Sequence, residues 1–137
     1  MLAADARLRV VLADEPQHPA FARVIWNAHV AEMSDLSVAD REHLMCVVFA
    51  VEQAMRESLA PDKVNLASLG NMVAHLHWHV IGRWRDDARF PASVWSEPAG
   101  RDPALAAARA NTVRQALPRL RSAIVDRLQP LGLDRSN

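Results

Sequence analysis

Residues 70–83 read GNMVAHLHWHVIGR and hold three of the six histidines of the chain, His75, His77 and His79. Apolar residues alternate with these histidines, and in a β-strand successive side chains point to opposite faces. The alternation therefore predicts a strand over Ala74–Arg83 that carries the three imidazoles on one face. A row of imidazoles is typical of a reactive or ligand-binding surface.

A metal site is the first chemistry to test for this row. Same-face neighbours on a strand stand about 6.6 Å apart and the outer pair about 13 Å apart. Zinc–nitrogen bonds are about 2.1 Å long, so two neighbouring histidines can share an ion but all three cannot do so without strain. The spacing of Asp86, Asp87 and Glu97 singles out no further ligand. We therefore expect no metal, and a metal-dependent enzyme remains the less favoured alternative.

Binding and reaction of an anion such as phosphate fit the histidine row better than a metal site does. Imidazole titrates near pH 6.5, so a neutral ring can act as nucleophile or base while a charged neighbour donates hydrogen bonds to phosphoryl oxygens. The pattern favours phosphoryl or nucleotidyl transfer. The plain alternative is a strand whose histidines are only solvated or hydrogen-bonded.

The same residues carry a family resemblance. His75–Ile81 resembles the signature of the histidine triad (HIT) superfamily, HφHφHφφ with φ apolar, and residues 70–73 stand where that family has its Gly-x-x-Val. Asn27–Leu36 and Lys63–Ala67 also resemble bacterial members of the branch that is similar to diadenosine polyphosphate hydrolases. The matching segments together cover residues 8–98 approximately.

The resemblance implies a covalent mechanism. His77 matches the middle histidine, which attacks the α-phosphorus of a nucleoside polyphosphate or phosphoramidate and forms a nucleotidyl-histidine that water hydrolyses. His79 matches the histidine that contacts the phosphate and the leaving group, and His75 matches the one that supports and orients the nucleophile. The resemblance implies no metal and no other cofactor.

Three asparagines extend the expected site. Asn65 and Asn71 match positions that approach ribose or phosphate in relatives, and Asn27 matches a position near the nucleoside. Asparagine is also a common turn residue, so each has a structural alternative. At Met72 many active relatives carry Ser or Thr, and a thioether donates no hydrogen bond. A nucleotide-binding module with little turnover is therefore the main functional alternative.

The length and composition of the chain indicate its domain number, its class of partner and its location. The chain has 137 residues, half of them hydrophobic, with 16 basic and 16 acidic side chains. This length suits one HIT-like domain over residues 1–137. A zero net charge argues against a nucleic-acid polymer as partner. The resemblance implies a small-molecule nucleotide as substrate. No apolar run approaches a membrane span, and the first residues lack a signal-peptide core, so we expect a cytoplasmic protein that does not contact a membrane.

Periodicity predicts an α+β fold with an antiparallel sheet of about five strands and two main helices on one face. Leu8–Leu12 and Phe21–Trp26 form one predicted antiparallel pair. A third strand, Lys63–Ser68, pairs antiparallel with the histidine strand because the loop between them is too short for a helical crossover. Val94–Trp95 is predicted as a short last strand.

Two helices complete the predicted fold. The first begins at the N-cap Ser37 and runs with i+3/i+4 apolar spacing until Pro61. The second covers residues 103–128 approximately, begins at Asp102-Pro103, and should kink or break at Pro118.

The resemblance also implies a homodimer. The first helix has more apolar circumference than one buried stripe needs, through Val47, Val48 and Val51 with nearby Cys46 and Phe49. A second copy of the chain would cover that excess. The competing interpretation is that the C-terminal helix covers it within one chain.

Overall fold

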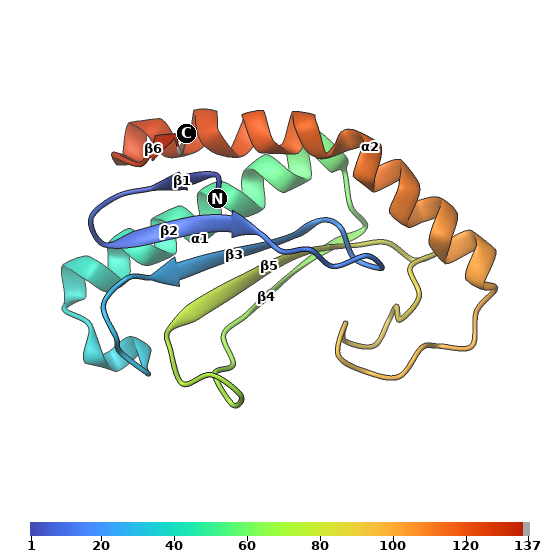
Figure 1. The fold of residues 1–137 in the computed structure, drawn as a ribbon, viewed down its shortest axis with the longest axis horizontal. Coiled ribbons are helices and arrows are strands. Elements are labelled where there is room, and N and C mark those ends of the chain that lie inside the picture. The colour runs from blue at the N-terminus through green and yellow to red at the C-terminus, as the bar shows by residue number, and fades with distance from the viewer. Residues whose placement is uncertain (136–137) are drawn as a thin grey trace.

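An antiparallel sheet of six strands forms the centre of the protein, as the computed structural model of residues 1–135 shows (Figure 1). Its strand order is β4-β5-β3-β2-β1-β6. The strands are β1 (Ala3–Ala4), β2 (Leu8–Leu12), β3 (Phe21–Trp26), β4 (Lys63–Ala67), β5 (His77–Arg83) and β6 (Asp134–Arg135). The helices are α1 (Val38–Leu59) and α2 (Pro103–Leu128), with 3₁₀ turns η1 (Met33–Asp35) and η2 (Gln129–Leu131). The predicted α+β class and the antiparallel pairings are confirmed.

One face of the sheet is apolar and packs against α1, which lies behind the sheet in Figure 1. Val24 lies opposite Val10 on one side and Trp78 on the other, so these side chains share this face. The sheet and α1 lie close together at Gly82, where an added Cβ would lie 3.1 Å from the sulfur of Met55. Neither α1 nor α2 covers the opposite face, so among residues 1–135 that face is open to a ligand.

The second helix, α2, packs mainly against α1 and runs along the upper edge of the molecule in Figure 1. Val47, Val48 and Val51 of α1 are completely buried within the single chain. The prediction that these valines leave an uncovered apolar surface is therefore wrong, because two helices and a sheet enclose them. Phe49, with an exposed fraction of 48%, remains uncovered.

Both predicted helix starts are confirmed. The Ser37 side chain accepts a hydrogen bond from the backbone N–H of Asp40, and Asp102 accepts one from Ala104 at 2.9 Å. Pro118 lies inside α2 without ending it. The helix bends part-way along its length in Figure 1 and continues, as a helix that contains a proline is expected to do when it does not break.

Three strand predictions need correction, and two strands were missed. The histidine strand begins at His77 and not at Ala74, because the backbone N–H of His75 bonds to Val73 and that of Leu76 bonds to Val30, at 2.8 Å each. The third strand ends at Ala67 and not at Ser68. Residues 94–95 form turns in place of a strand. The two-residue strands β1 and β6 were not predicted, since they are too short to show a period.

No helix within residues 1–135 is long and apolar enough to span a membrane.

Candidate active site

The open face of the sheet carries two cross-strand rows that end at histidines. Arg9, Ile25 and His77 lie opposite one another across β2, β3 and β5, and Arg23 lies opposite His79 in the next row. These rows form the floor of a cavity of about 980 Å³. The cavity is lined by Arg9, Arg23, Ile25, His29, residues 69–75, His77, His79 and Trp95. All three predicted histidines therefore meet at one cavity.

His77 is held in a single tautomer by its neighbour's backbone. Its Nδ1 lies 2.7 Å from the carbonyl oxygen of His75, and a carbonyl only accepts, so Nδ1 carries the proton. In the neutral ring Nε2 then has a free lone pair. This Nε2 lies 3.1 Å from Nε2 of His79, which must be the donor of that hydrogen bond. The structure thus presents an unprotonated nitrogen of His77 toward its neighbour and the cavity.

His79 is enclosed and uncharged at neutral pH. Its ring centroid lies 5.2 Å from those of both Phe21 and Trp95, and only 6% of the residue is exposed. Burial, together with the positive charges available at His77 and Arg23, lowers the pKa of His79 to about 4. Its Nδ1 is buried and has no hydrogen-bond partner among residues 1–135. His79 is therefore a neutral donor through Nε2.

His75 lies before β5, and its side chain points to a different partner from the other two. Its Nε2 donates to the carbonyl oxygen of Trp26 at 2.6 Å, and its Nδ1 lies 3.3 Å from Nδ1 of His29. The rings of His75 and His29 stack with centroids 5.5 Å apart. Only His77 and His79 are therefore on the strand itself, while His75 lines the same cavity from the loop before it and supports His77 through its backbone carbonyl.

The three predicted asparagines are placed apart. Asn71 lines the cavity, in the loop between β4 and β5. Asn65 lies on β4, where its side-chain oxygen accepts a hydrogen bond from Nη1 of Arg83 at 3.0 Å. The side-chain oxygen of Asn27 accepts from Nη1 of Arg9 at 2.8 Å. The structure brings Asn71 to the cavity lining. It pairs Asn65 with Arg83, which is outside the lining, and Asn27 with Arg9, which is part of it.

Several cavity residues were not predicted from the sequence. Arg9 and Arg23 alternate with apolar residues on β2 and β3, so their shared face could have been predicted from the antiparallel pairing. His29 belongs to a matching segment but has no strand or helix to place it. Trp95 lies on an irregular loop, and no periodicity marks such a residue.

A buried ion pair and its hydrogen bonds hold the loop that carries Trp95 in place. Arg83 is 1% exposed, and its Nε and Nη2 donate to the two carboxylate oxygens of Asp87 at 2.7 and 3.0 Å. Nη2 of Arg83 also donates to the carbonyl of Ala92, and Nε of Arg89 donates to the carbonyl of Ser96 at 2.7 Å. The backbone is therefore fixed on both sides of Trp95.

No group of three or more His, Cys, Asp or Glu side chains in residues 1–135 is arranged to hold a metal ion. The polar groups that face the cavity are imidazoles, guanidinium groups and one amide. These groups donate hydrogen bonds to anions.

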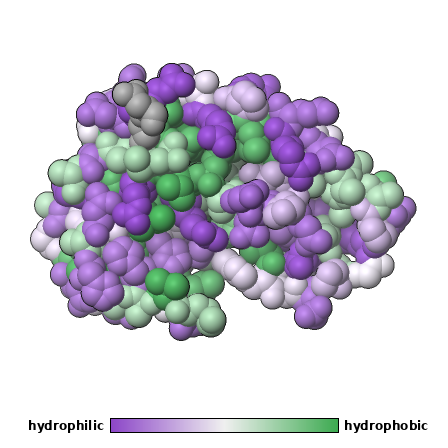
Figure 2. Space-filling view, in the orientation of Figure 1, coloured by the Kyte–Doolittle hydropathy of each residue, from purple (hydrophilic) through white to green (hydrophobic). Residues whose placement is uncertain are grey.

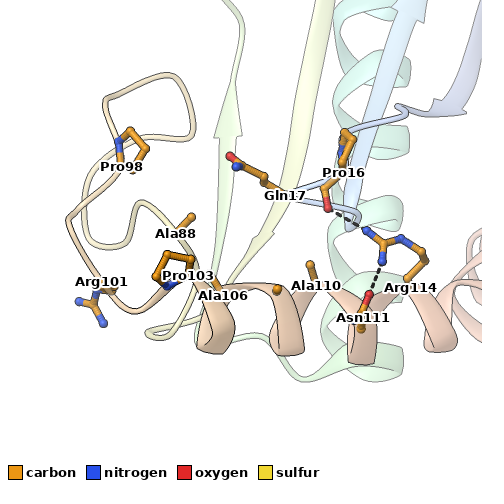
Figure 3. A pocket seen from close by; sticks show the side chains of 11 residues that line it. Pro16, Gln17, Ala88, Pro98, Arg101, Pro103, Ala106, Ala110, Asn111 and Arg114 are labelled. Atoms are coloured by element: carbon orange, nitrogen blue, oxygen red, sulfur yellow. Dashed lines mark hydrogen bonds between the residues drawn. The ribbon is translucent and has the colours of Figure 1, made fainter.

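A second cavity, of about 340 Å³, lies between α2 and the loops that precede it (Figure 3). Its walls are mostly proline and alanine, with Gln17, Arg101, Asn111 and Arg114 among them. In Figure 3 the Arg114 guanidinium donates to Asn111 and to the carbonyl of Pro16. The lining of this cavity offers no nucleophile, acid or base, so the histidine cavity is the stronger candidate for an active site.

The histidine cavity and the fold agree with a comparison against known families, in which the model of the HIT domain matches residues 1–86. The chain belongs to the HIT domain family. Proteins of this family are generally nucleotide hydrolases or transferases. The broader part of the predicted resemblance is thus confirmed.

Solved structures of other HIT proteins share the fold. A histidine triad protein from Bradyrhizobium japonicum is 28% identical, with a TM-score of 0.71 over 90% of this chain and 88% of that one. A histidine triad protein from Marinobacter aquaeolei is 26% identical, with a TM-score of 0.64 over 87% and 88% of the two chains. One from Sinorhizobium meliloti is 21% identical, with a TM-score of 0.69 over 89% and 87%. No curated protein matches the sequence.

Proposed function

We propose that this HIT protein cleaves a nucleoside polyphosphate or phosphoramidate at the α-phosphate through a nucleotidyl-histidine intermediate on His77. The observation that carries the proposal is the tautomer of His77. The hydrogen bond from Nδ1 to the His75 carbonyl leaves Nε2 of the neutral ring unprotonated at the cavity, where its lone pair accepts a hydrogen bond from His79. A nucleophile needs such a lone pair, and a group held in place by a backbone bond needs no reorganisation before attack.

The proposed reaction has two steps. Nε2 of His77 forms a bond to the α-phosphorus while the bond from phosphorus to the leaving group breaks, and the electron pair departs with the leaving group. Water then attacks the same phosphorus, and the electron pair of the phosphorus–nitrogen bond returns to Nε2. In total, one proton of the water goes to the leaving group and its hydroxyl is added to the phosphorus of the nucleotide, so atoms and charges balance.

Neighbouring groups would stabilise the charge that develops on the phosphoryl oxygens. His79 donates through Nε2 at 3.1 Å from the nucleophile and can transfer this hydrogen bond to a phosphoryl oxygen. Arg23 lies beside His79 on the neighbouring strand, and its Nε is buried and has no partner among residues 1–135. Asn71 supplies an amide donor from the β4–β5 loop.

The test is the fate of the α-phosphate in His77→Ala. Wild type and variant are assayed with diadenosine polyphosphates and with adenosine phosphoramidate, and both are quenched in acid-free denaturant after a pulse of α-³²P substrate. We expect label on the wild-type chain, none on the variant, and no effect of a chelator. Full activity in His77→Ala, or its loss on chelation, would contradict the proposal and favour another nucleophile or a metal-dependent enzyme.

A binding module with little turnover is the second candidate, and Met72 favours it. This residue lines the cavity where many relatives have a hydroxyl, and losing one donor to a developing charge costs about 10²–10³ in rate where that donor is central. Tight binding of AMP without measurable turnover of any nucleotidyl substrate would select this candidate.

We further propose a homodimer that uses α1 and the free sheet edge at β4. Phe49 on α1 is 48% exposed, and β4 ends the sheet with its outer hydrogen-bonding groups unpaired by another strand of residues 1–135. Exposed strand edges and exposed aromatic rings are both surfaces that a partner chain covers.

A further inference from the structure

The second cavity lies apart from the histidine cavity. The two linings have no residue in common. The β4–β5 loop, which lines the histidine cavity, forms the hydrophobic projection at the lower edge of Figure 2, whereas α2 begins at the right-hand edge of Figure 1. A volume of about 340 Å³ lies within the range of about 300–1,000 Å³ that is usual for small-molecule sites. The second cavity is therefore large enough to hold a small ligand of its own.

The walls of the second cavity are apolar. Three of its eleven lining residues are proline and four are alanine, and the side chains of these seven form no hydrogen bonds. In Figure 3 Ala106 and Ala110 lie along α2, while Ala88 and Pro98 belong to the loop segments that precede the helix. A polar group placed between such walls would lose its hydrogen bonds to water without replacement. The part of a ligand that lies between them should therefore be apolar.

The charged side chains of the lining are all positive. The lining contains Arg101 and Arg114 and no carboxylate, and in Figure 3 these arginines lie at opposite ends of the cavity. Neither takes part in an ion pair within residues 1–135. Arg114 donates through Nη1 to the side-chain oxygen of Asn111 and through Nη2 to the carbonyl of Pro16 at 2.9 Å, and both acceptors are neutral. An anionic ligand would thus meet a guanidinium group that has no anionic partner in this part of the chain.

Another arginine of α2 shows how such a group binds a carboxylate. Nε and Nη2 of Arg109 donate to the two carboxylate oxygens of Asp86 at 2.8 Å each. Arginine has five N–H donors, and Arg114 uses two of them within residues 1–135. The donors that remain include Nε and one hydrogen of Nη2, on the same two atoms that Arg109 uses. Two parallel N–H donors match the two oxygens of a carboxylate.

We propose that the second cavity binds a small apolar carboxylic acid, with its carboxylate on Arg114 and its aliphatic or aromatic body between the alanine and proline walls. The single negative charge matches the one guanidinium group at that end of the cavity. The proposed site goes beyond the proposed reaction at His77 and does not depend on it, because the two cavities share no lining residue.

The test uses 4-phenylbutyrate as the probe and NMR titration of the backbone amides as the measurement. Ligands of this size bind at about millimolar concentration. We expect saturable shifts centred on the amides of Ala106 and Ala110, which line the cavity. The neutral amide of the same acid, 4-phenylbutyramide, should bind about three to ten times more weakly, because it loses the charge but keeps the body. Acetate, which keeps the charge but has almost no body, should not saturate over the same range.

Two variants with matched controls locate the site. Arg114→Gln should weaken binding of 4-phenylbutyrate about three- to tenfold and leave binding of the amide unchanged, whereas Arg119→Gln, an exposed arginine of α2 outside the lining, should change neither. Ala106→Leu fills the cavity and should abolish binding of both compounds. Ala108→Leu is the control, since this exposed residue of α2 is not part of the lining. Circular dichroism checks that each variant is folded.

Several results would overturn the proposal. One is the absence of saturable shifts at the second cavity in the wild-type protein. Another is equal binding of the acid and the amide, or of acetate and the acid, since the site would then lack the proposed selectivity. A third is binding that is weakened by Arg23→Gln and unaffected by Arg114→Gln, which would place the probe in the histidine cavity. None of these results bears on the labelling of His77, so the proposed function is tested separately.

Discussion

The indole of Trp95 lies across the imidazole of His79, with ring centroids 5.2 Å apart and ring planes at 66°. Phe21 lies at the same distance on another side of the imidazole. Together the two aromatic rings exclude water from a histidine whose neighbour is the proposed nucleophile. The protonation state of His79 therefore depends on a loop far from it in the sequence.

Removing the Trp95 ring should raise the pKa of His79 from about 4 toward 6.5, because the imidazole gains water and the penalty on its charged form falls. Proton NMR titration of the histidine rings measures this, with the His79→Gln spectrum to assign the resonance. Phe49→Ala, which removes an exposed ring on α1, is the control and should leave the titration as in wild type. A titration of His79 that does not move in Trp95→Ala would contradict the shielding role.

The lowered pKa also predicts the sign of a pH effect on stability. Between pH 4 and pH 6.5 the unfolded chain protonates this histidine and the folded chain does not. The unfolded state thus binds more protons, so the free energy of unfolding should rise with pH across this window. Urea melts at intervals from pH 4 to pH 7 should show that slope, and the slope should be smaller in His79→Gln. Equal slopes in the two proteins would count against a neutral His79 in the folded state.

The buried pair of Arg83 and Asp87 predicts a large cost for removing one partner alone. Asp87→Ala leaves a guanidinium that is 1% exposed without its carboxylate, which typically costs about 3–5 kcal/mol. Thermal melting should show a drop of roughly 10 °C in a chain of this size. The double variant Arg83→Met with Asp87→Leu removes both charges and should lose less than Asp87→Ala. A double variant that is less stable than the single one would show that the pair stabilises the fold through other contacts.

Local patterns were sufficient for most elements of the fold. Short, largely apolar runs on either side of a turn-rich segment placed β2 and β3, and the N-caps Ser37 and Asp102 placed the starts of both helices. The start of β5 could not be predicted from alternation, because Leu76 bonds to Val30 beyond the end of β3, and periodicity does not contain such a long-range contact. The strands β1 and β6 depend on pairing between the two ends of the chain for the same reason.

In the candidate site, too, local patterns in the sequence predicted some features and long-range contacts determine the others. The three histidines were found because their spacing is itself the signal. Their different roles follow from hydrogen bonds that cross the fold, such as that from His75 to the carbonyl of Trp26. The pair of Arg83 with Asp87 likewise joins β5 to the loop that carries Trp95. The aromatic shield of Trp95 has no local signal, since its loop is shaped by buried side chains from β5.

Met72→Ser should raise turnover of adenosine phosphoramidate, because a hydroxyl beside the cavity can donate to the phosphate where the thioether cannot. The side chain is almost fully exposed, so the melting temperature should stay within a few degrees, as expected for a change of under about 1 kcal/mol. Steady-state kinetics and thermal melting measure the two effects. An unchanged rate in a folded variant would show that Asn71, His79 or Arg23 already fills this role.

The proposed homodimer predicts that Phe49→Glu dissociates the protein without unfolding it. The side chain is 48% exposed in the single chain, so a carboxylate there meets water in the monomer but would be buried without a partner in a dimer interface. Val47, Val48 and Val51 are already covered within one chain, which leaves Phe49 and the β4 edge as the surface to test.

Light scattering gives the mass of wild type and variant, and circular dichroism gives the fold. Leu105→Glu on α2 is the matched control, an exposed apolar residue on the other helix, and should keep the wild-type mass. A monomeric wild type, or a Phe49→Glu protein that stays dimeric, would contradict the proposed contact surface.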